Sequence, residues 1–341
     1  MNRRLVSESA PPSGRLAAIL IFGISAISTL GASPTGSPPS LSAEVSSALS
    51  GIGREKSAAL VRIRCRDQAG EITGSGFLID PTGTVCTLTD LIRGASYISV
   101  ESGGKSSPAT LLASDQRTGI CFLKTSLAQT SFIPPFPSGS LSPNAPVVAL
   151  ANSISNDGTF NQPVLGITET KIDHDGVRFF PVPLVTALLP SSGCKPATPV
   201  FDLSQKFAGI VVRSGLTNDS CAILPASAVE KLHGDLLRFG RLNPGWIGVE
   251  VEESAVPEGS SRTRIAEVEP NSPAERAGIR SGDTLLFIEN HSIVMPQEVL
   301  ECSYYLSAGQ EVSLVLSRAG QIRRLSLHCA PVPPETKLSR E

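Results

Sequence analysis

The sequence has little histidine and no cluster of basic residues. Only four of its 341 residues are histidines: His174, His233, His291 and His328. Lysine and arginine number 29 against 31 acidic residues, with no basic run, so we do not expect a nucleic-acid partner. The seven cysteines include no C-x-x-C pair, which argues against a zinc site. We therefore expect no metal and no cofactor.

The length and composition indicate two domains built largely from short strands. A chain of 341 residues with 40% hydrophobic content can bury a sizeable core. Leu60–Arg66 alternates apolar and charged side chains, which is typical of a half-buried strand. Similar short apolar runs follow at roughly ten-residue spacing without intervening helices, and this spacing predicts an all-β barrel or sandwich.

The first 32 residues have the pattern of a secretory signal peptide. Arg3, Arg4 and Arg15 precede an apolar stretch over 16–30, and small residues follow it. We expect export to the periplasm or the extracellular space, and the alternative is a membrane anchor formed by residues 16–30. Residues 33–51 are rich in Ser, Pro, Gly and Ala, which predicts a flexible linker.

Four segments resemble the HtrA family of secreted serine proteases. Residues 74–83 (GSGFLIDPTG) and 87–95 (TLTDLIRGA) resemble the part of that family that delivers the catalytic histidine. Residues 115–124 (DQRTGICFLK) resemble the strand that carries the triad aspartate, and 194–202 (CKPATPVFD) resemble the nucleophile segment. On this resemblance the histidine, aspartate and serine positions hold Asp90, Gly119 and Pro196.

The resemblance implies a chymotrypsin-like double β-barrel over 52–240, without its catalytic groups. A serine hydrolase needs a base beside its hydroxyl and a group that orients that base. The oxyanion hole also loses a donor, because Pro196 has no backbone N–H. We therefore expect a pseudoprotease with no catalytic residues. The alternative is an active serine endopeptidase with a rearranged nucleophile, such as Ser192.

A second resemblance, to the PDZ domains that follow HtrA-type proteases, begins at Pro244. It covers 244–251 (PGWIGVEV) and 266–283, within an expected domain over 243–330, and we expect the tail 331–341 to be disordered. Local signals support this interpretation independently of the resemblance. Ser272 followed by Pro273 is typical of a helix start, and Gly278 is typical of a helix end. Pro296 opens a second short helix, which we expect to run to Leu306.

The PDZ resemblance implies binding of C-terminal or extended peptides as a strand added to a sheet edge. The expected site consists of the carboxylate loop, the start of the edge strand and the second helix: Gly245, Trp246, Ile247, Gly248, Val249, Val299, Leu300, Ser303 and Tyr304. A second interpretation is that Trp246 and Ile247 pack under the sheet. By resemblance, homo-oligomers or mixed oligomers with an active HtrA-type protease are further expected partners.

Seven cysteines in an exported chain leave at least one unpaired within the chain. Trypsin-like folds often bridge the region of the nucleophile loop to the region that follows the strand at 207–212. By that resemblance we expect a disulfide between Cys194 and Cys221, and the alternative is two independent buried thiols.

Overall fold

The computed structural model describes residues 41–333, apart from 69, 128–130, 137, 138, 140, 156, 157, 175–178, 216–218 and 256–260. The expected signal peptide, the anchor stretch 16–30 and most of the tail therefore lie outside the described residues. Within the described part, no helix is long and apolar enough to cross a membrane.

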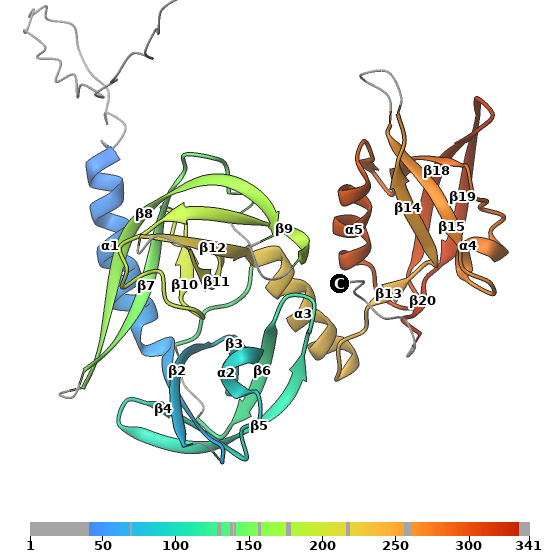
Figure 1. Ribbon diagram of the computed structural model, residues 1–341. Coiled ribbons are helices and arrows are strands. Elements are labelled where there is room, and N and C mark those ends of the chain that lie inside the picture. Colours follow the sequence, from blue (N-terminus) through green and yellow to red (C-terminus); the bar gives the residue numbers. More distant parts are fainter. Residues whose placement is uncertain are drawn as a thin grey trace, which may run out of the picture. The chain divides into compact units, whose positions relative to one another are not determined.

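Two closed six-stranded barrels follow one another along the chain (Figure 1). The first has the strand order β1-β2-β3-β6-β5-β4 and the second β10-β11-β12-β9-β8-β7. The strands of the first are β1 (Leu60–Arg66), β2 (Glu71–Leu78), β3 (Thr84–Leu88), β4 (Tyr97–Ser102), β5 (Lys105–Ser114) and β6 (Ile120–Thr125). Those of the second are β7 (Pro146–Ser155), β8 (Gly158–His174), β9 (Phe179–Leu188), β10 (Pro199–Phe201), β11 (Phe207–Ser214) and β12 (Ser220–Pro225). This confirms the predicted chymotrypsin-like double barrel.

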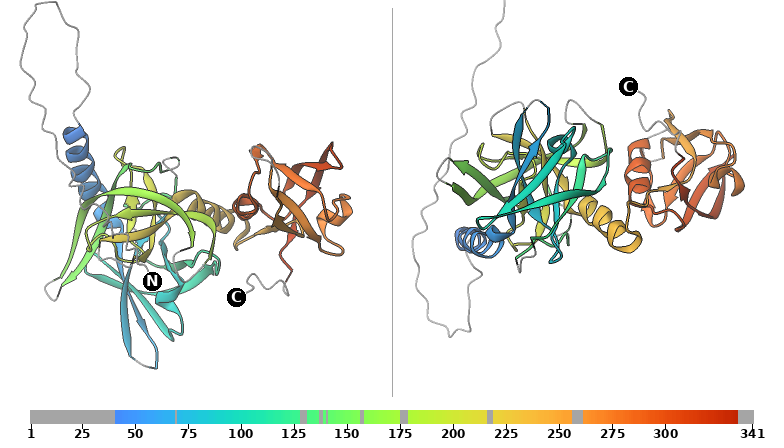
Figure 2. Two further views of the ribbon diagram at one scale, coloured as in Figure 1. Left: turned by 45° about the horizontal axis from the view of Figure 1, so that its top comes forward. Right: turned by 90° about the horizontal axis from the view of Figure 1, so that it is seen from below.

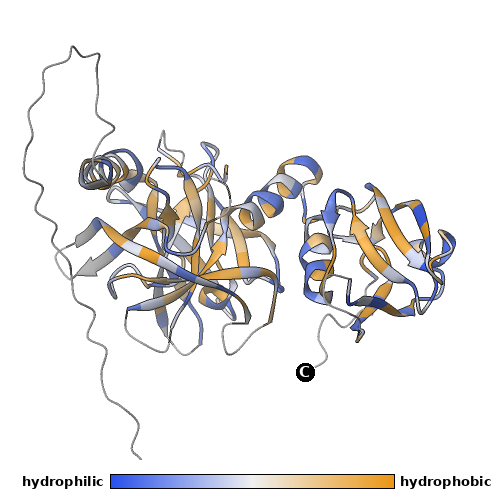
Figure 3. Cartoon of the chain, turned by 90° about the horizontal axis from the view of Figure 1, so that it is seen from above, coloured by the Kyte–Doolittle hydropathy of each residue, from blue (hydrophilic) through white to orange (hydrophobic). Residues whose placement is uncertain are grey.

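The alternation of apolar and charged residues in β1 has the predicted effect. Ile63 and Cys65 are buried, whereas Arg62 and Arg64 lie closer to solvent and pair with Glu101 of β4. Figure 3 shows hydrophobic residues concentrated along the strands of the barrels. The strands thus form the core, and the turns between them can hold the residues of a binding or catalytic site.

A helix begins where the sequence predicted a flexible linker. Helix α1 (Leu41–Lys56) lies against β7 and β8 of the second barrel (Figure 2). Ala48 and Ile52, four residues apart, are fully buried in the barrel core. The prediction of a linker over 33–51 is therefore wrong for residues 41–51, because burial of this apolar stripe outweighs the Ser- and Gly-rich composition. Two short helical segments complete the first barrel: η1 (Ser57–Ala59) and α2 (Thr89–Ile92).

Helix α3 (Ala226–Phe239) follows the second barrel and ends at Gly240, whose φ of 67° forms a left-handed cap. The following sheet has the order β14-β15-β16-β18-β19, with β17 paired to β16 and a separate β13-β20 pair. The strands are β13 (Gly245–Trp246), β14 (Val249–Glu253), β15 (Thr263–Val268), β16 (Thr284–Ile288), β17 (His291–Ser292), β18 (Glu311–Arg318), β19 (Gln321–His328) and β20 (Ala330–Pro331). Two helices pack on this sheet, as predicted: α4 (Pro273–Arg276) and α5 (Pro296–Tyr305).

Candidate functional site

One cavity brings together the three residues that the family resemblance assigns to the triad positions. It has a volume of about 580 Å³, and its lining includes Asp90, Gly119 and Pro196. The first barrel contributes α2 and the turn before β6, and the second contributes the segment before β10. The residues that sequence comparison selected separately therefore share one site between the two barrels.

Asp90, which the resemblance places at the histidine position, lies on α2, the short helix after β3. Its carboxylate accepts a hydrogen bond from the Arg93 guanidinium at 2.7 Å, and both side chains are about two-thirds exposed. A carboxylate held in a surface ion pair is a poor substitute for an imidazole, whose pKa near neutrality suits proton transfer.

Gly119, which the resemblance places at the aspartate position, has a backbone conformation that favours glycine. Its φ is 77°, in the left-handed region where a Cβ atom is strained. The Gly119 N–H donates to the Asp115 carbonyl at 2.8 Å. The Gly119 carbonyl in turn accepts a hydrogen bond from the Thr89 N–H at 2.7 Å. The turn is thus closed by backbone hydrogen bonds and offers no side chain to orient a base.

Pro196, which the resemblance places at the nucleophile position, lies in a loop whose next two backbone N–H groups already donate within the protein. The Ala197 N–H donates to the Val211 carbonyl at 2.8 Å, and the Thr198 N–H donates to the Lys195 carbonyl at 3.2 Å. Pro196 itself has no N–H. An oxyanion hole requires N–H groups aimed at the reacting oxygen, and residues 196–198 have none to spare.

The alternative nucleophile, Ser192, is half-buried and is not part of the cavity lining. No histidine lines the cavity within the described part of the chain. His233 is buried on α3, where its Nε2 lies 3.3 Å from Asp80 Oδ2. His291 and His328 lie on strands of the C-terminal sheet, and the His174 side chain lies outside the described residues.

The predicted disulfide between Cys194 and Cys221 is wrong in this structure, in which both residues are free thiols. Both are buried in the core of the second barrel, and Cys194 Sγ donates to the Leu189 carbonyl at 3.1 Å. Burial raises the pKa of each thiol. The reactive thiolate is therefore disfavoured, which also argues against a cysteine nucleophile at Cys194.

The expected carboxylate loop leads into an edge strand. The chain passes from β13 through Ile247 and Gly248 into β14, which is the first strand of the sheet. Gly248 has a φ of 84°, and a Cβ there would collide with Ser272. Ile247 is 5% exposed and belongs to the core, and the Gly245 N–H already donates to the Leu306 carbonyl at 2.9 Å. The edge of β14 is thus placed as a peptide-binding strand requires, although Ile247 packs under the sheet.

The four expected residues of α5 point in different directions. Val299 is buried in the core of the C-terminal sheet. Leu300 is 43% exposed, and Ser303 is half-buried. Tyr304 is 1% exposed and belongs to the barrel core cluster, with the Arg117 guanidinium carbon 4.7 Å from its ring centroid. Tyr304 therefore does not line the peptide groove as predicted, because its ring packs against the barrel.

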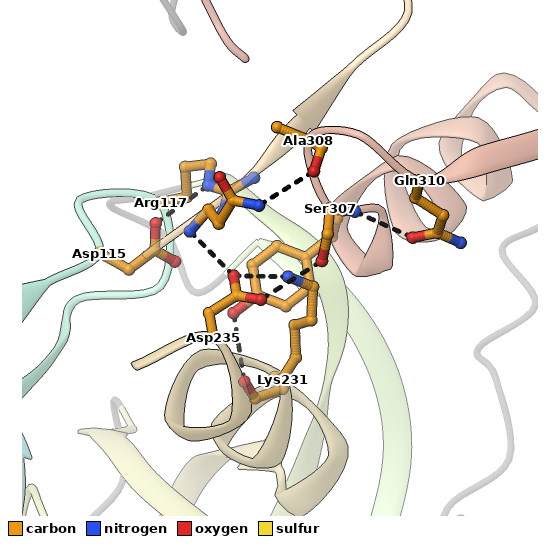
Figure 4. A network of polar contacts seen from close by, with 10 residues as sticks. Asp115, Arg117, Lys231, Asp235, Ser307, Ala308 and Gln310 are labelled. Carbon is orange, nitrogen blue, oxygen red and sulfur yellow. Dashed lines mark hydrogen bonds and ion pairs between the residues drawn. The ribbon is translucent and has the colours of Figure 1, made fainter. Parts of the chain in front are cut away.

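Sequence reasoning missed a network of polar contacts around Asp235 (Figure 4). The Asp235 carboxylate on α3 accepts hydrogen bonds from Lys231 Nζ at 2.6 Å, from Asn243 N at 3.0 Å and from Ser307 Oγ at 3.3 Å. The Asn243 side chain in turn donates to the Ala308 carbonyl at 3.1 Å. These contacts tie the segment that follows α5 to α3. The sequence signals these contacts only through an aspartate, Asp235, within the predicted closing helix.

No group of three or more His, Cys, Asp or Glu side chains suited to a metal ion occurs among the described residues. Neither the cavity nor the C-terminal sheet presents metal-ligand chemistry in that part of the chain. The site is thus a cavity between two barrels, together with a sheet edge that has the position of a peptide-binding strand.

Comparisons with known proteins agree with this architecture. A PDZ domain model matches residues 264–318. The chain is 24% identical over 284 residues to a Pseudomonas fluorescens protein named "Probable periplasmic serine endoprotease DegP-like", covering 80% of the chain and 59% of that relative. A Marinomonas protein of the same name is 26% identical, with 78% and 58% covered. The chain therefore spans somewhat more than half the length of these curated relatives.

Solved structures show the same fold. The HtrA-type protease AlgW with a tripeptide superposes with a TM-score of 0.67 at 20% identity, covering 84% of this chain and 98% of AlgW. The serine endoprotease from Yersinia pestis superposes with a TM-score of 0.59 at 21% identity, covering 87% and 100%. With its double barrel and its PDZ domain, the chain is a homologue of the DegP- and HtrA-type serine endoproteases.

Proposed function

We propose that this protein is an exported pseudoprotease that binds peptides through its PDZ domain and does not cleave them. The observation that carries the proposal is the cavity in which Asp90, Gly119 and Pro196 lie together. The protease scaffold surrounds these positions, but no histidine lines the cavity among the described residues, and Pro196 offers no hydroxyl at the position that the resemblance gives to the nucleophile. In a serine protease, removal of the full triad lowers turnover by roughly a million-fold.

Export is supported by the signal-like residues 1–32 and by relatives that are named as periplasmic. In that compartment a protein that captures peptide ends without cleaving them would act as a scaffold or a regulator in protein quality control. Homo-oligomers, or mixed oligomers with an active HtrA-type protease, belong to the same proposal. Co-purification with a catalytically inactive HtrA-type protease would test the mixed assembly.

The PDZ domain is proposed to take up the C-terminal end of an extended peptide along β14. The peptide backbone would pair with Val249–Glu253, and its carboxylate would meet the N–H groups of the loop at 246–248. The loop contains no charged side chain, so an apolar terminal residue fits best. By the resemblance, Leu300 of α5 would contact that residue; it is 43% exposed, whereas Val299 and Tyr304 are buried.

Titration of the full chain with a free-carboxylate peptide and with its amidated form tests this mode of binding. We expect the free acid to bind at least tenfold more tightly, because hydrogen bonds to a charged group are the stronger ones. Leu300→Ser should weaken binding, whereas Leu237→Ser, at a 69% exposed leucine of α3, should leave it unchanged. Equal affinity for the acid and the amide would contradict carboxylate capture.

The competing function is an active endopeptidase that uses Ser192. Its only specific support is the position of Ser192 four residues before Pro196. The structure places this serine outside the cavity lining, with no histidine there among the described residues. The geometry therefore supports peptide binding without cleavage better than an active endopeptidase.

A further inference from the structure

The cavity between the barrels has the dimensions of a small-molecule site. Its volume of about 580 Å³ lies within the range that ligand pockets occupy. Apolar side chains of both barrels contribute to its walls: Leu88, Leu91, Phe180 and Val212. A cavity that only preserved a defunct active site would have no reason to present unsatisfied polar groups as well.

Asn152 on β7 supplies such a group. Its side chain lines the cavity, is 4% exposed, and donates from Nδ2 to the Val61 carbonyl at 3.4 Å. Its Oδ1 is buried and has no hydrogen-bond partner. The orientation of the amide follows from this contact, because the Val61 carbonyl can only accept. A buried carbonyl oxygen without a donor costs stability, so its presence points to a donor that arrives with a ligand.

Three other polar side chains of the lining have protein partners. Thr87 Oγ1 donates to the Ser75 carbonyl at 2.8 Å, and Thr118 Oγ1 donates to Asp115 Oδ2 at 2.8 Å. The Asp90 carboxylate accepts from Arg93. The unsatisfied acceptor of Asn152 therefore differs from its neighbours in the same cavity.

The charge of the lining favours an anion. Lys195 and Arg213 bring two positive charges to the cavity, whereas the single acid of the lining, Asp90, is paired with Arg93. Lys195 is exposed and makes no ion pair with any described residue. An acidic group that enters the cavity would therefore gain an opposite charge without displacing an existing partner.

We propose that this cavity binds a small monoanionic molecule with an apolar body and an amide N–H. In this arrangement the carboxylate pairs with Lys195, the N–H donates to Asn152 Oδ1, and the apolar body contacts Leu91 and Phe180. N-acyl amino acids have this chemistry. The proposal goes beyond peptide capture by the PDZ domain, and no bond is made or broken in the cavity.

Isothermal titration calorimetry of the full chain with N-acetyl-L-phenylalanine tests the proposal. Two matched probes each remove one interaction: the neutral N-acetyl-L-phenylalaninamide and N-acetyl-N-methyl-L-phenylalanine, which has no amide N–H. We expect the acid to bind, and each analogue to bind roughly tenfold more weakly. No binding of the acid, or equal binding of all three, would overturn the proposal.

Three variants locate the binding. Lys195→Gln and Asn152→Leu should each lower the affinity for N-acetyl-L-phenylalanine roughly tenfold. Asn152→Leu should also remove the preference for the probe with an amide N–H over the N-methyl probe. Lys206→Gln changes an exposed lysine outside the cavity and should have no effect. Binding that is insensitive to Lys195→Gln would place the carboxylate at the PDZ domain and would overturn the proposal.

The unliganded Asn152→Leu variant separates a binding role from a structural one. The substitution removes the unsatisfied Oδ1 together with the long Nδ2 hydrogen bond to the Val61 carbonyl at 3.4 Å, and these two effects oppose each other, so the thermal midpoint should change little. A large fall in the midpoint would show that Asn152 serves the fold. If that variant does not fold, the comparison of the N–H and N-methyl probes on the unaltered protein still decides the proposal.

Discussion

The Gly119 carbonyl accepts two hydrogen bonds from Thr89, one from the amide N at 2.7 Å and one from Oγ1 at 3.0 Å. This pair connects the turn that contains Gly119 to the residue before Asp90. The two segments are therefore held together by contacts that need neither the Asp90 side chain nor a side chain at position 119.

The buried Asp80 should make stability depend on pH in the acid range. Burial alone raises the pKa of this carboxyl, but hydrogen bonds from Thr84, Thr82 and His233 outweigh it and lower the pKa to about 2 from 3.8. A folded pKa below the unfolded one gives stability above about pH 4, which is lost as the pH falls through 2. The contribution at neutral pH is about 2 kcal/mol.

Urea unfolding of Asp80→Asn at a series of pH values checks this effect. The variant should be less stable than the unaltered protein at pH 7, by about 2 kcal/mol, and the two should converge between pH 4 and pH 2. Glu252→Gln, at an exposed residue of β14, controls for the change in net charge. A constant difference across the whole pH range would contradict the low pKa of Asp80.

Tyr304 should stabilise the contact of the PDZ domain with the barrel. Its ring lies beneath the Arg117 guanidinium and makes an edge contact with Tyr305 at 5.3 Å between ring centroids. Removing a buried aromatic side chain costs about 3–5 kcal/mol, so Tyr304→Ala should be strongly destabilising. Tyr304→Phe keeps the ring and loses only the hydroxyl, which donates to the Ala228 carbonyl at 3.4 Å and hydrogen-bonds with the Thr118 side chain; each of these bonds is worth about 1 kcal/mol.

Fluorescence and circular dichroism of the two Tyr304 variants measure the contact. Trp246, the single tryptophan, lies in β13 and reports on the PDZ domain, while far-ultraviolet circular dichroism reports on the whole chain. We expect the unfolding transitions followed by fluorescence and by circular dichroism to coincide for Tyr304→Phe and to separate for Tyr304→Ala. Coincident transitions in both variants would show that Tyr304 does not couple the domains.

All seven cysteines should titrate as thiols in the purified protein. The structure shows each of them as a free cysteine, and six are buried. We expect slow alkylation in the folded state, because burial suppresses the thiolate, and seven modified residues after unfolding without a reductant. Fewer than seven, with Cys194 and Cys221 protected together, would contradict the free thiols seen here.

Local sequence patterns predicted the parts of the fold that local chemistry determines. The alternating residues of β1 and the capped helix after Ser272 formed as expected, since Ser272 Oγ accepts from the Glu275 N–H at 3.1 Å. Helix α1 was missed because its stability comes from burial of Ala48 and Ile52 against the barrel, which composition does not reveal.

The candidate site was predictable only in part, for a related reason. Sequence resemblance selected Asp90, Gly119 and Pro196, and folding brought them to one cavity. The burial of Tyr304 could not be predicted, because helical spacing shows which residues share a face but not which domain covers that face. The unsatisfied oxygen of Asn152 likewise depends on neighbours that are distant in the sequence.

The most direct test of the central claim is reaction of the purified protein with a fluorophosphonate probe, followed by incubation with unfolded casein. We predict no labelling and intact casein over hours, for the unaltered chain and also for Pro196→Ser, which restores the hydroxyl without a base. Proper folding of both proteins would be verified by PDZ binding of a free-carboxylate peptide. Labelling or cleavage that disappears in Ser192→Ala would contradict the account and identify a rearranged active site.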